Sequence, residues 1–126
     1  MEERKFLALR DIGAYTKSLK LSNEIWSMVL HWNYFSRDTI GKQYVRAVDS
    51  ISANIAEGFG RYYKKDKVLF YRYAYGSLHE SIDWTVKSRI RSLLDQETYN
   101  RILTLLKELQ PALHHLIKFT NEKLKK

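Results

Sequence analysis

The sequence has no cysteine among its 126 residues, which excludes disulfide bonds, thiolate metal sites and cysteine nucleophiles. The lack of cysteine also fits a cytoplasmic protein. One proline and five glycines are few interruptions, as expected of a helical chain. No apolar run has the length of a membrane span, and Met1–Phe6 lacks the apolar segment of a signal peptide. We therefore expect a cytoplasmic protein with no membrane partner.

Apolar residues are plentiful by comparison. They make up 44% of the chain, so the sequence can bury a core and is not disordered by composition. A chain of this length is enough for one domain, which we expect to span residues 1–126. No internal repeat or strand pattern is present.

Positive charge exceeds negative charge. Lysine and arginine number 22 against 14 acidic residues, which gives a formal net charge of +8. Such an excess favours a polyanionic partner, either RNA, DNA or an acidic protein surface. Part of the excess lies at the C-terminal end, where a basic tail can simply be solvated.

Apolar periodicity predicts four helices, at about residues 12–32, 39–57, 65–91 and 96–120, after a short leader at 1–10. Asp11, either Asp38 or Thr39, and Asp95 are the expected N-caps of the first, second and fourth helices. Short links between amphipathic helices favour antiparallel neighbours. The predicted fold is an all-α, antiparallel, up-down-up-down four-helix bundle.

The first helix carries two adjacent apolar stripes, which predict a wide buried face. One stripe is Tyr15, Leu19, Trp26 and Val29, and the other is Leu21, Ile25, Met28 and Trp32. Tyr34 and Phe35 in the following link are expected to fold back on the bundle. Phe6, Leu7 and Leu9 of the leader are expected to pack on the bundle end or on a neighbouring subunit.

The second helix ends in the stretch Ser50–Arg61, which leads from an apolar face into a glycine turn. Gly58 and Gly60 are expected to adopt positive φ, stop the helix and turn the chain. Asn54 and Glu57 are three residues apart and share a face. Their polar groups either satisfy backbone groups of the turn or form a site, and the first interpretation is favoured.

The third helix has a row of small residues. Its members are Ala74, Ser77, Ser81, Thr85 and Ser88. Small side chains let helix backbones approach closely, so Gly76 and Ser77 are predicted to mark a close contact between helices. Without such a contact Gly76 would cost about 1 kcal/mol relative to alanine.

No catalytic or metal constellation is apparent. The four histidines are His31, His79, His114 and His115, and none follows a glutamate at the spacing that di-iron bundles use. Glu57 and Glu80 would form a carboxylate pair with one raised pKa if both were buried and close. Hydrogen bonding to neighbouring groups is the favoured interpretation. We expect neither a cofactor nor an enzyme.

The best positive evidence for a function is a cluster of cations mixed with tyrosines, which favours nucleic-acid binding. Cations neutralise phosphates, and tyrosines stack on exposed bases. The candidate nucleic-acid-binding residues are Arg61, Lys64, Lys65, Lys67 and Arg72, with Lys42 and Arg46 as an extension. The alternative is a solvated polar face with its tyrosines packed in an interface. Tyr71, Tyr73 and Tyr75 spread around the helix, so at least one must lie off the core.

Two blocks resemble the family named for the protein encoded within 23S ribosomal RNA intervening sequences. Ser50–Arg61 looks like its signature, and Phe70–Glu80 resembles its aromatic-x-x-x-Ala-x-Gly-Ser-Leu-x-Glu stretch. Gly41–Ala47 fits as well. The resemblance implies a four-helix bundle that assembles as a homopentamer. It also implies a fold similar to the accessory variability proteins of diversity-generating retroelements, which are thought to contact nucleic acid and reverse transcriptase.

Three function classes follow. The first is a non-enzymatic oligomeric bundle that binds RNA or DNA through a basic surface. The second is a homo-oligomeric structural or adaptor protein with an acidic protein partner. The third, a bundle enzyme, would need a convergent polar pocket around Asn54, Glu57 and Glu80.

Overall fold

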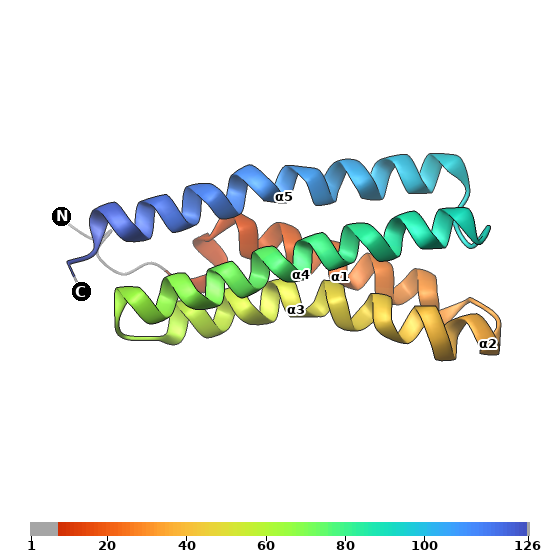
Figure 1. Ribbon diagram of the computed structural model, residues 1–126, viewed down its shortest axis with the longest axis horizontal. Helices are drawn as coiled ribbons and strands as arrows, with labels where there is room; N and C mark the ends of the chain where they lie inside the picture. Colours follow the sequence, from red (N-terminus) through yellow and green to blue (C-terminus); the bar gives the residue numbers. More distant parts are fainter. Residues whose placement is uncertain (1–7, 126) are drawn as a thin grey trace.

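The structure is a computed structural model that describes residues 8–125. This part of the chain contains helices and no strand. Its long helices are α1 (Gly13–Leu30), α3 (Lys42–Gly60), α4 (Lys64–Ile90) and α5 (Gln96–Lys123). Successive long helices run in opposite directions along the long axis of the molecule (Figure 1). The predicted all-α four-helix bundle is confirmed, while the leader residues Phe6 and Leu7 lie outside the described residues.

One core joins the four helices. α3 packs against both α1 and α4, α5 packs mainly along α4, and the contact between α1 and α5 is thin. Fully buried side chains come from every long helix, among them Ile25, Ile51, Leu78 and Leu106. Burying a side chain of this size stabilises the fold by about 1.5–3 kcal/mol. No helix between residues 8 and 125 is long and apolar enough to cross a membrane.

The N-terminus of α1 differs from the prediction. Asp11 belongs to a 3-10 turn, η2 (Leu9–Asp11), and its Oδ2 accepts a hydrogen bond from the Ala8 N–H at 2.9 Å. The residue at the N-cap of α1 is Ile12, which has no capping side chain. Asp11 therefore caps the preceding turn and not the helix. Leu9 packs against the core, as expected of the leader.

The face of α1 is narrower than the two stripes predicted. Leu21, Ile25 and Val29 are buried, but Leu19 and Trp26 are exposed, Trp26 at 56%. The cause is the packing of α1, which contacts α3 along its length and α5 only thinly. The prediction of a wide buried face is wrong for this chain on its own.

The link between α1 and α3 is helical. It contains α2 (Tyr34–Ser36) and the π-helical turn η3 (Arg37–Gly41), which continues into α3. The Asn33 side chain accepts a hydrogen bond from the Ser36 N–H at 2.9 Å and so provides the N-cap. The capping roles predicted for Asp38 and Thr39 are therefore wrong, because the helical stretch begins earlier.

Tyr34 and Phe35 were expected to fold back on the bundle, and this prediction is also wrong. They are 71% and 74% exposed. Because α2 holds them in a helical turn, neither side chain reaches the core.

Four of the five small residues in the predicted row on α4 are buried, while the fifth, Ser77, is half-buried. Ala74, Leu78, Ser81, Thr85 and Ser88 follow one another at alternating spacings of four and three, and all are buried. The three hydroxyl groups donate to the carbonyl oxygens four residues earlier, at 2.7–2.8 Å. Their polar atoms are thus satisfied within the helix, so burying them carries little penalty.

The predicted N-cap at Asp95, at the end of the connection between α4 and α5, is confirmed. Asp95 Oδ1 accepts a hydrogen bond from the Thr98 N–H at 2.7 Å and caps α5. This hydrogen bond lowers the pKa of Asp95 below its usual value. Ser92 turns the chain with a φ of +62°.

Candidate nucleic-acid interface

A basic groove lies where the start of α4 meets the end of α5. It has a volume of about 630 Å³. Its lining residues are Lys64, Lys65, Asp66, Val68, Leu69, Arg72, Asn121 and Lys125. Four are cations and one is an acid, while Val68 and Leu69 supply apolar surface between them. The groove therefore combines positive charge with a partly apolar wall.

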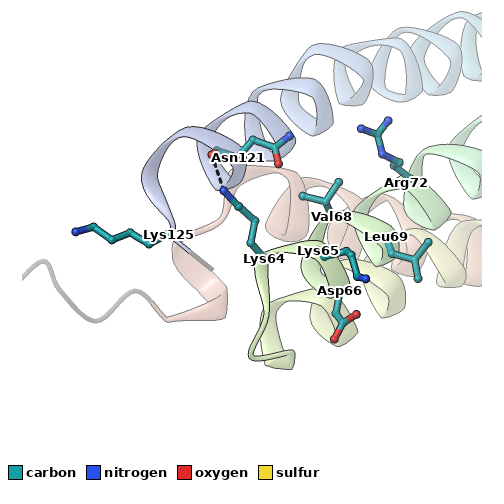
Figure 2. A pocket seen from close by; sticks show the side chains of 8 residues that line it. All are labelled: Lys64, Lys65, Asp66, Val68, Leu69, Arg72, Asn121 and Lys125. Atoms are coloured by element: carbon teal, nitrogen blue, oxygen red, sulfur yellow. Dashed lines mark hydrogen bonds between the residues drawn. The ribbon is translucent and has the colours of Figure 1, made fainter.

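The side chains of α4 define the groove (Figure 2). Lys64 Nζ donates to the Asn121 carbonyl oxygen at 3.2 Å and so links the two helices. Arg72, about two turns further along, points toward α5, whereas Lys125 points away from the other lining side chains. Lys65 and Arg72 are exposed, and neither forms a salt bridge within residues 8–125. Their charges are available to an anion.

Arg61 is near this end of the bundle but is already engaged. Its guanidinium pairs with the Glu57 carboxylate at 2.7 Å and lies 4.6 Å from the centre of the Phe70 ring. The ion pair joins two residues one turn apart at the end of α3, and both are about half exposed. Arg61 thus has part of its charge neutralised.

The Lys67 ammonium group forms two hydrogen bonds within the bundle. Its Nζ donates to the carbonyl oxygens of Phe59 at 2.7 Å and Gly58 at 3.4 Å, at the end of α3. A cation at a helix C-terminus interacts favourably with the carbonyls left unpaired there. Partial burial lowers the pKa of Lys67. The position of Lys67 makes it a cap of α3 and not a lining residue of the groove.

Lys42 and Arg46 lie at the other end of the bundle. They sit at the start of α3, whose 19 residues span about 28 Å at 1.5 Å per residue. Lys42 also pairs with Asp38 at 3.5 Å. The structure therefore does not bring these two cations together with Lys65 and Arg72, and the predicted extension of one continuous patch is wrong.

A family model for the 23S rRNA-intervening sequence protein matches residues 10–115. This stretch includes all four long helices except the end of α5. The chain belongs to the 23S rRNA-intervening sequence protein family.

A solved structure supports the fold of this family member. It is a protein of unknown function from the S23 ribosomal protein family of Bacteroides thetaiotaomicron, with a TM-score of 0.75 and 23% identity. The match covers 83% of this chain and 98% of that one. No curated protein matches this sequence.

The conformation of the stretch Ser50–Arg61 differs from the prediction. Gly58 and Gly60 lie inside α3, and none of the described glycines has a positive φ. A Cβ on Gly58 would lie 2.6 Å from Tyr71 Cε1 and 3.0 Å from the Lys67 carbonyl oxygen. Gly58 is thus required by the close approach of α4, while Gly60 has open space around it.

The polar groups of the signature do not form a pocket. Asn54 Nδ2 donates to the Ser50 carbonyl oxygen at 2.8 Å, and Glu57 pairs with Arg61. On α4, Glu80 accepts a hydrogen bond from Trp84 Nε1 at 3.1 Å. Glu57 and Glu80 are both exposed, so the buried carboxylate pair considered from the sequence is absent. Hydrogen bonding was the favoured interpretation, but the partners are Ser50, Arg61 and Trp84, one turn away in each case, and not backbone groups of a turn.

The second block of the family pattern also differs. Gly76 is exposed, and a Cβ there would meet nothing within 4 Å, so the predicted close contact at Gly76 is wrong. Ser77 is half-buried, and its carbonyl accepts the Ser81 hydroxyl. The glycines that do allow a close approach are Gly58 and Gly41. A Cβ on Gly41 would lie 2.7 Å from Val29 Cγ1.

The three alternating tyrosines occupy different environments, as their spacing predicts. Tyr71 is buried, and burial raises its pKa to about 12. Tyr75 lies between two histidine rings, 4.7 Å from His79 and 4.9 Å from His114. Tyr73 is 50% exposed and contacts the Phe70 ring edge to face at 5.4 Å. Tyr73 is therefore the one of the three that is open to a ligand.

Sequence reasoning missed part of the groove. Asn121 contributes only its backbone carbonyl to Lys64, which no side-chain pattern reveals. Lys125 belongs to the basic C-terminal end of the chain, and the packing of α5 on α4 brings it to the groove. Between residues 8 and 125 no group of three histidine or acidic side chains is placed to hold a metal ion.

Proposed function

We propose that this protein is a non-catalytic helical bundle that binds nucleic acid through phosphate contacts at the basic groove. One observation carries the proposal: Lys65 and Arg72 lie seven residues apart on one exposed face of α4, without an acidic partner in the described chain. Cations in this arrangement release the counterions of a phosphate backbone, which favours binding at low salt. The family description, which names a ribosomal RNA, makes RNA the first ligand to test.

The proposal includes assembly of the protein as a homo-oligomer, with the pentamer that the family resemblance implies. Its support is a set of exposed apolar side chains, Trp26, Leu30, Tyr34, Phe35 and Ile90. They belong to α2 and to the last turns of α1 and α4, which lie at the end of the bundle opposite the start of α4 (Figure 1). Apolar and aromatic side chains of this kind are enriched in the cores of protein interfaces. Light scattering coupled to size exclusion tests this part, and a mass of one chain at all concentrations would contradict it.

The binding experiment uses a fluorescently labelled single-stranded RNA and titrates it at several salt concentrations. The variant Lys65→Gln/Arg72→Gln is compared with Lys42→Gln/Arg46→Gln, which removes the same charge at the other end of the bundle. We expect the first variant to flatten the slope of log affinity against log salt by about 1.4 for two phosphates of a single strand. The second should leave the slope unchanged.

If the two double variants changed the salt slope equally, the result would contradict a binding site confined to the groove at one end of the bundle. RNA binding that is absent at every salt concentration would overturn the proposed function.

A second candidate is an adaptor that binds an acidic protein, with a reverse transcriptase as one example of a protein partner. A smaller groove of about 240 Å³ favours it, because Trp26, Leu30 and Val45 line the groove together with Arg37 and Lys42. Binding there would depend mainly on apolar burial, so its affinity would change little with salt. The variant Trp26→Ala would weaken a protein complex of this kind and leave RNA affinity unchanged.

A further inference from the structure

Gly76 has no packing reason to be a glycine. It lies in the interior of α4, it is exposed, and a Cβ would meet nothing within 4 Å. Glycine in a helix interior costs about 1 kcal/mol relative to alanine. The chain therefore contains a destabilising residue at a position where its own fold leaves room for a Cβ.

The missing side chain at Gly76 affects the exposure of the Tyr73 ring. Side chains on a helix lean toward its N-terminus, so residues three and four positions further along cover the side chain at a given position. For Tyr73 these two residues are Gly76 and Ser77. The glycine has no side chain and the serine has a single hydroxymethyl group. The C-terminal side of the Tyr73 ring is thus left uncovered by its own helix.

The uncovered ring and the cations of the groove belong to the same stretch of α4. Tyr73 directly follows Arg72, and Leu69 precedes it by one turn on the same side of α4. Lys65 lies eight residues before Tyr73, which is about 12 Å along the axis. The edge-to-face contact with Phe70, with an angle of 88° between the rings, restrains the orientation of the tyrosine. Cations, an apolar residue and an open aromatic ring therefore follow one another along one exposed face.

We propose that the Tyr73 ring, left open by Gly76, stacks on an unpaired base of a single-stranded nucleic acid whose phosphates contact Lys65 and Arg72. This inference rests on the proposed function and specifies its ligand. In a duplex the bases are already paired and stacked, so a ring on the protein surface cannot reach their faces. Stacking on an aromatic ring needs an unpaired base and tolerates any sequence.

The test compares two labelled strands of equal length, one with bases and one made of abasic sugar-phosphate units. Both carry the same charge, so the ratio of their affinities reports the contribution of base stacking. We expect the wild-type protein to prefer the strand with bases by about fivefold or more. Tyr73→Leu should reduce that ratio toward one without changing the salt slope, because the substitution removes no charge.

Gly76→Gln provides the sharper variant. Glutamine favours helix, and its Cβ would meet nothing within 4 Å, so the protein should melt at a higher temperature. The rest of the glutamine side chain would lean toward the N-terminus of α4 and cover the Tyr73 ring. We expect this more stable protein to lose the preference for the strand with bases. Gly13→Gln, at another glycine with open space around it, is the matched control and should keep the preference.

The outcomes separate the two proposals. If Lys65→Gln/Arg72→Gln weakens binding but Tyr73→Leu and Gly76→Gln keep the preference for bases, the groove holds phosphates and the stacking inference is wrong. Equal affinity of the wild-type protein for a duplex, a base-bearing strand and an abasic strand would also overturn it. A change of oligomeric mass in Gly76→Gln, with unchanged base preference, would assign this face to contacts between copies. Absence of all binding would overturn both proposals.

Discussion

The Tyr44 hydroxyl and Thr85 Oγ1 lie 2.7 Å apart in the core and form a buried hydrogen bond between α3 and α4. Thr85 Oγ1 also donates to the Ser81 carbonyl oxygen at 2.7 Å. Since a threonine hydroxyl has one proton, Tyr44 is the donor between the two side chains. The direction of this hydrogen bond makes the two partners unequal under mutation.

Thr85→Val should destabilise the protein more than Tyr44→Phe. The valine leaves the buried Tyr44 hydroxyl without its acceptor, which costs about 1–3 kcal/mol, whereas the phenylalanine leaves Thr85 bonded to Ser81 and costs about 1 kcal/mol. Urea denaturation of both variants measures the two differences in unfolding free energy. A larger loss in Tyr44→Phe would reverse the donor assignment.

Alkaline pH should destabilise the fold from about pH 10 upward. Burial raises the pKa of Tyr44 well above its usual value of 10.0 and that of Tyr71 to about 12. Both tyrosines are neutral in both states below pH 10, and above it the unfolded chain loses protons that the folded chain retains. The unfolding free energy therefore falls with rising pH, which urea denaturation from about pH 9 to about pH 11 measures. Tyr44→Phe should reduce the fall.

Gly58→Ala should cost about 1–3 kcal/mol, as is typical of overpacking, because the new methyl group would clash with the Tyr71 ring and approach the Lys67 carbonyl. Gly60→Ala places the same group in open space two residues later and should change stability little. Thermal melting of the pair measures the contrast. Equal melting temperatures would show that α4 shifts to accept the methyl group.

Lys67→Gln should lower stability by about 1 kcal/mol, since it removes a cation that caps the carbonyls of Phe59 and Gly58. The salt dependence of RNA binding should stay close to that of the wild-type protein, in contrast to substitution of Lys65. Denaturation and RNA titration on the same preparation check both expectations. If Lys67→Gln reduced the salt slope of RNA affinity as strongly as the single substitution Lys65→Gln, Lys67 would belong to the interface.

Glu57→Gln tests whether Glu57 has a structural role. Glu57 is exposed and paired with Arg61 one turn later, and such pairs are worth roughly 0.3–0.5 kcal/mol. We expect a folded protein with only a slightly lower melting temperature and unchanged RNA affinity. A loss of several degrees in melting temperature would restore the structural role considered from the sequence.

The sequence predicts the four long helices well because each has a long amphipathic pattern, and the ends of α4 and the cap at Asp95 agree closely with the structure. Its errors concern what tertiary packing decides. Gly58 and Gly76 look alike in the sequence, yet one is pressed against Tyr71 and the other has open space. Only the packing of helices distinguishes them.

The candidate site shows the same division. Charge identifies the cations, but it does not indicate that Lys67 turns back to α3 or that Lys42 lies at the opposite end of the bundle. The exposed state of Trp26 and Phe35 likewise depends on where neighbouring helices lie. Apolar periodicity predicts that such residues avoid water, and it does not distinguish a core from an interface.

Because the contact between α1 and α5 is thin, each of these two helices is held mainly by one neighbour, α1 by α3 and α5 by α4. Local opening begins where few buried contacts must be broken, so amide hydrogen exchange should be faster in α5 than in α3, which is held on both sides. Detachment would remove one wall of the basic groove and expose the apolar row of Ile102, Leu106 and Leu109. A ligand that contacts both α4 and α5 would therefore hold the two helices together. It would protect the protein from aggregation because it binds only the state in which α5 is packed on α4.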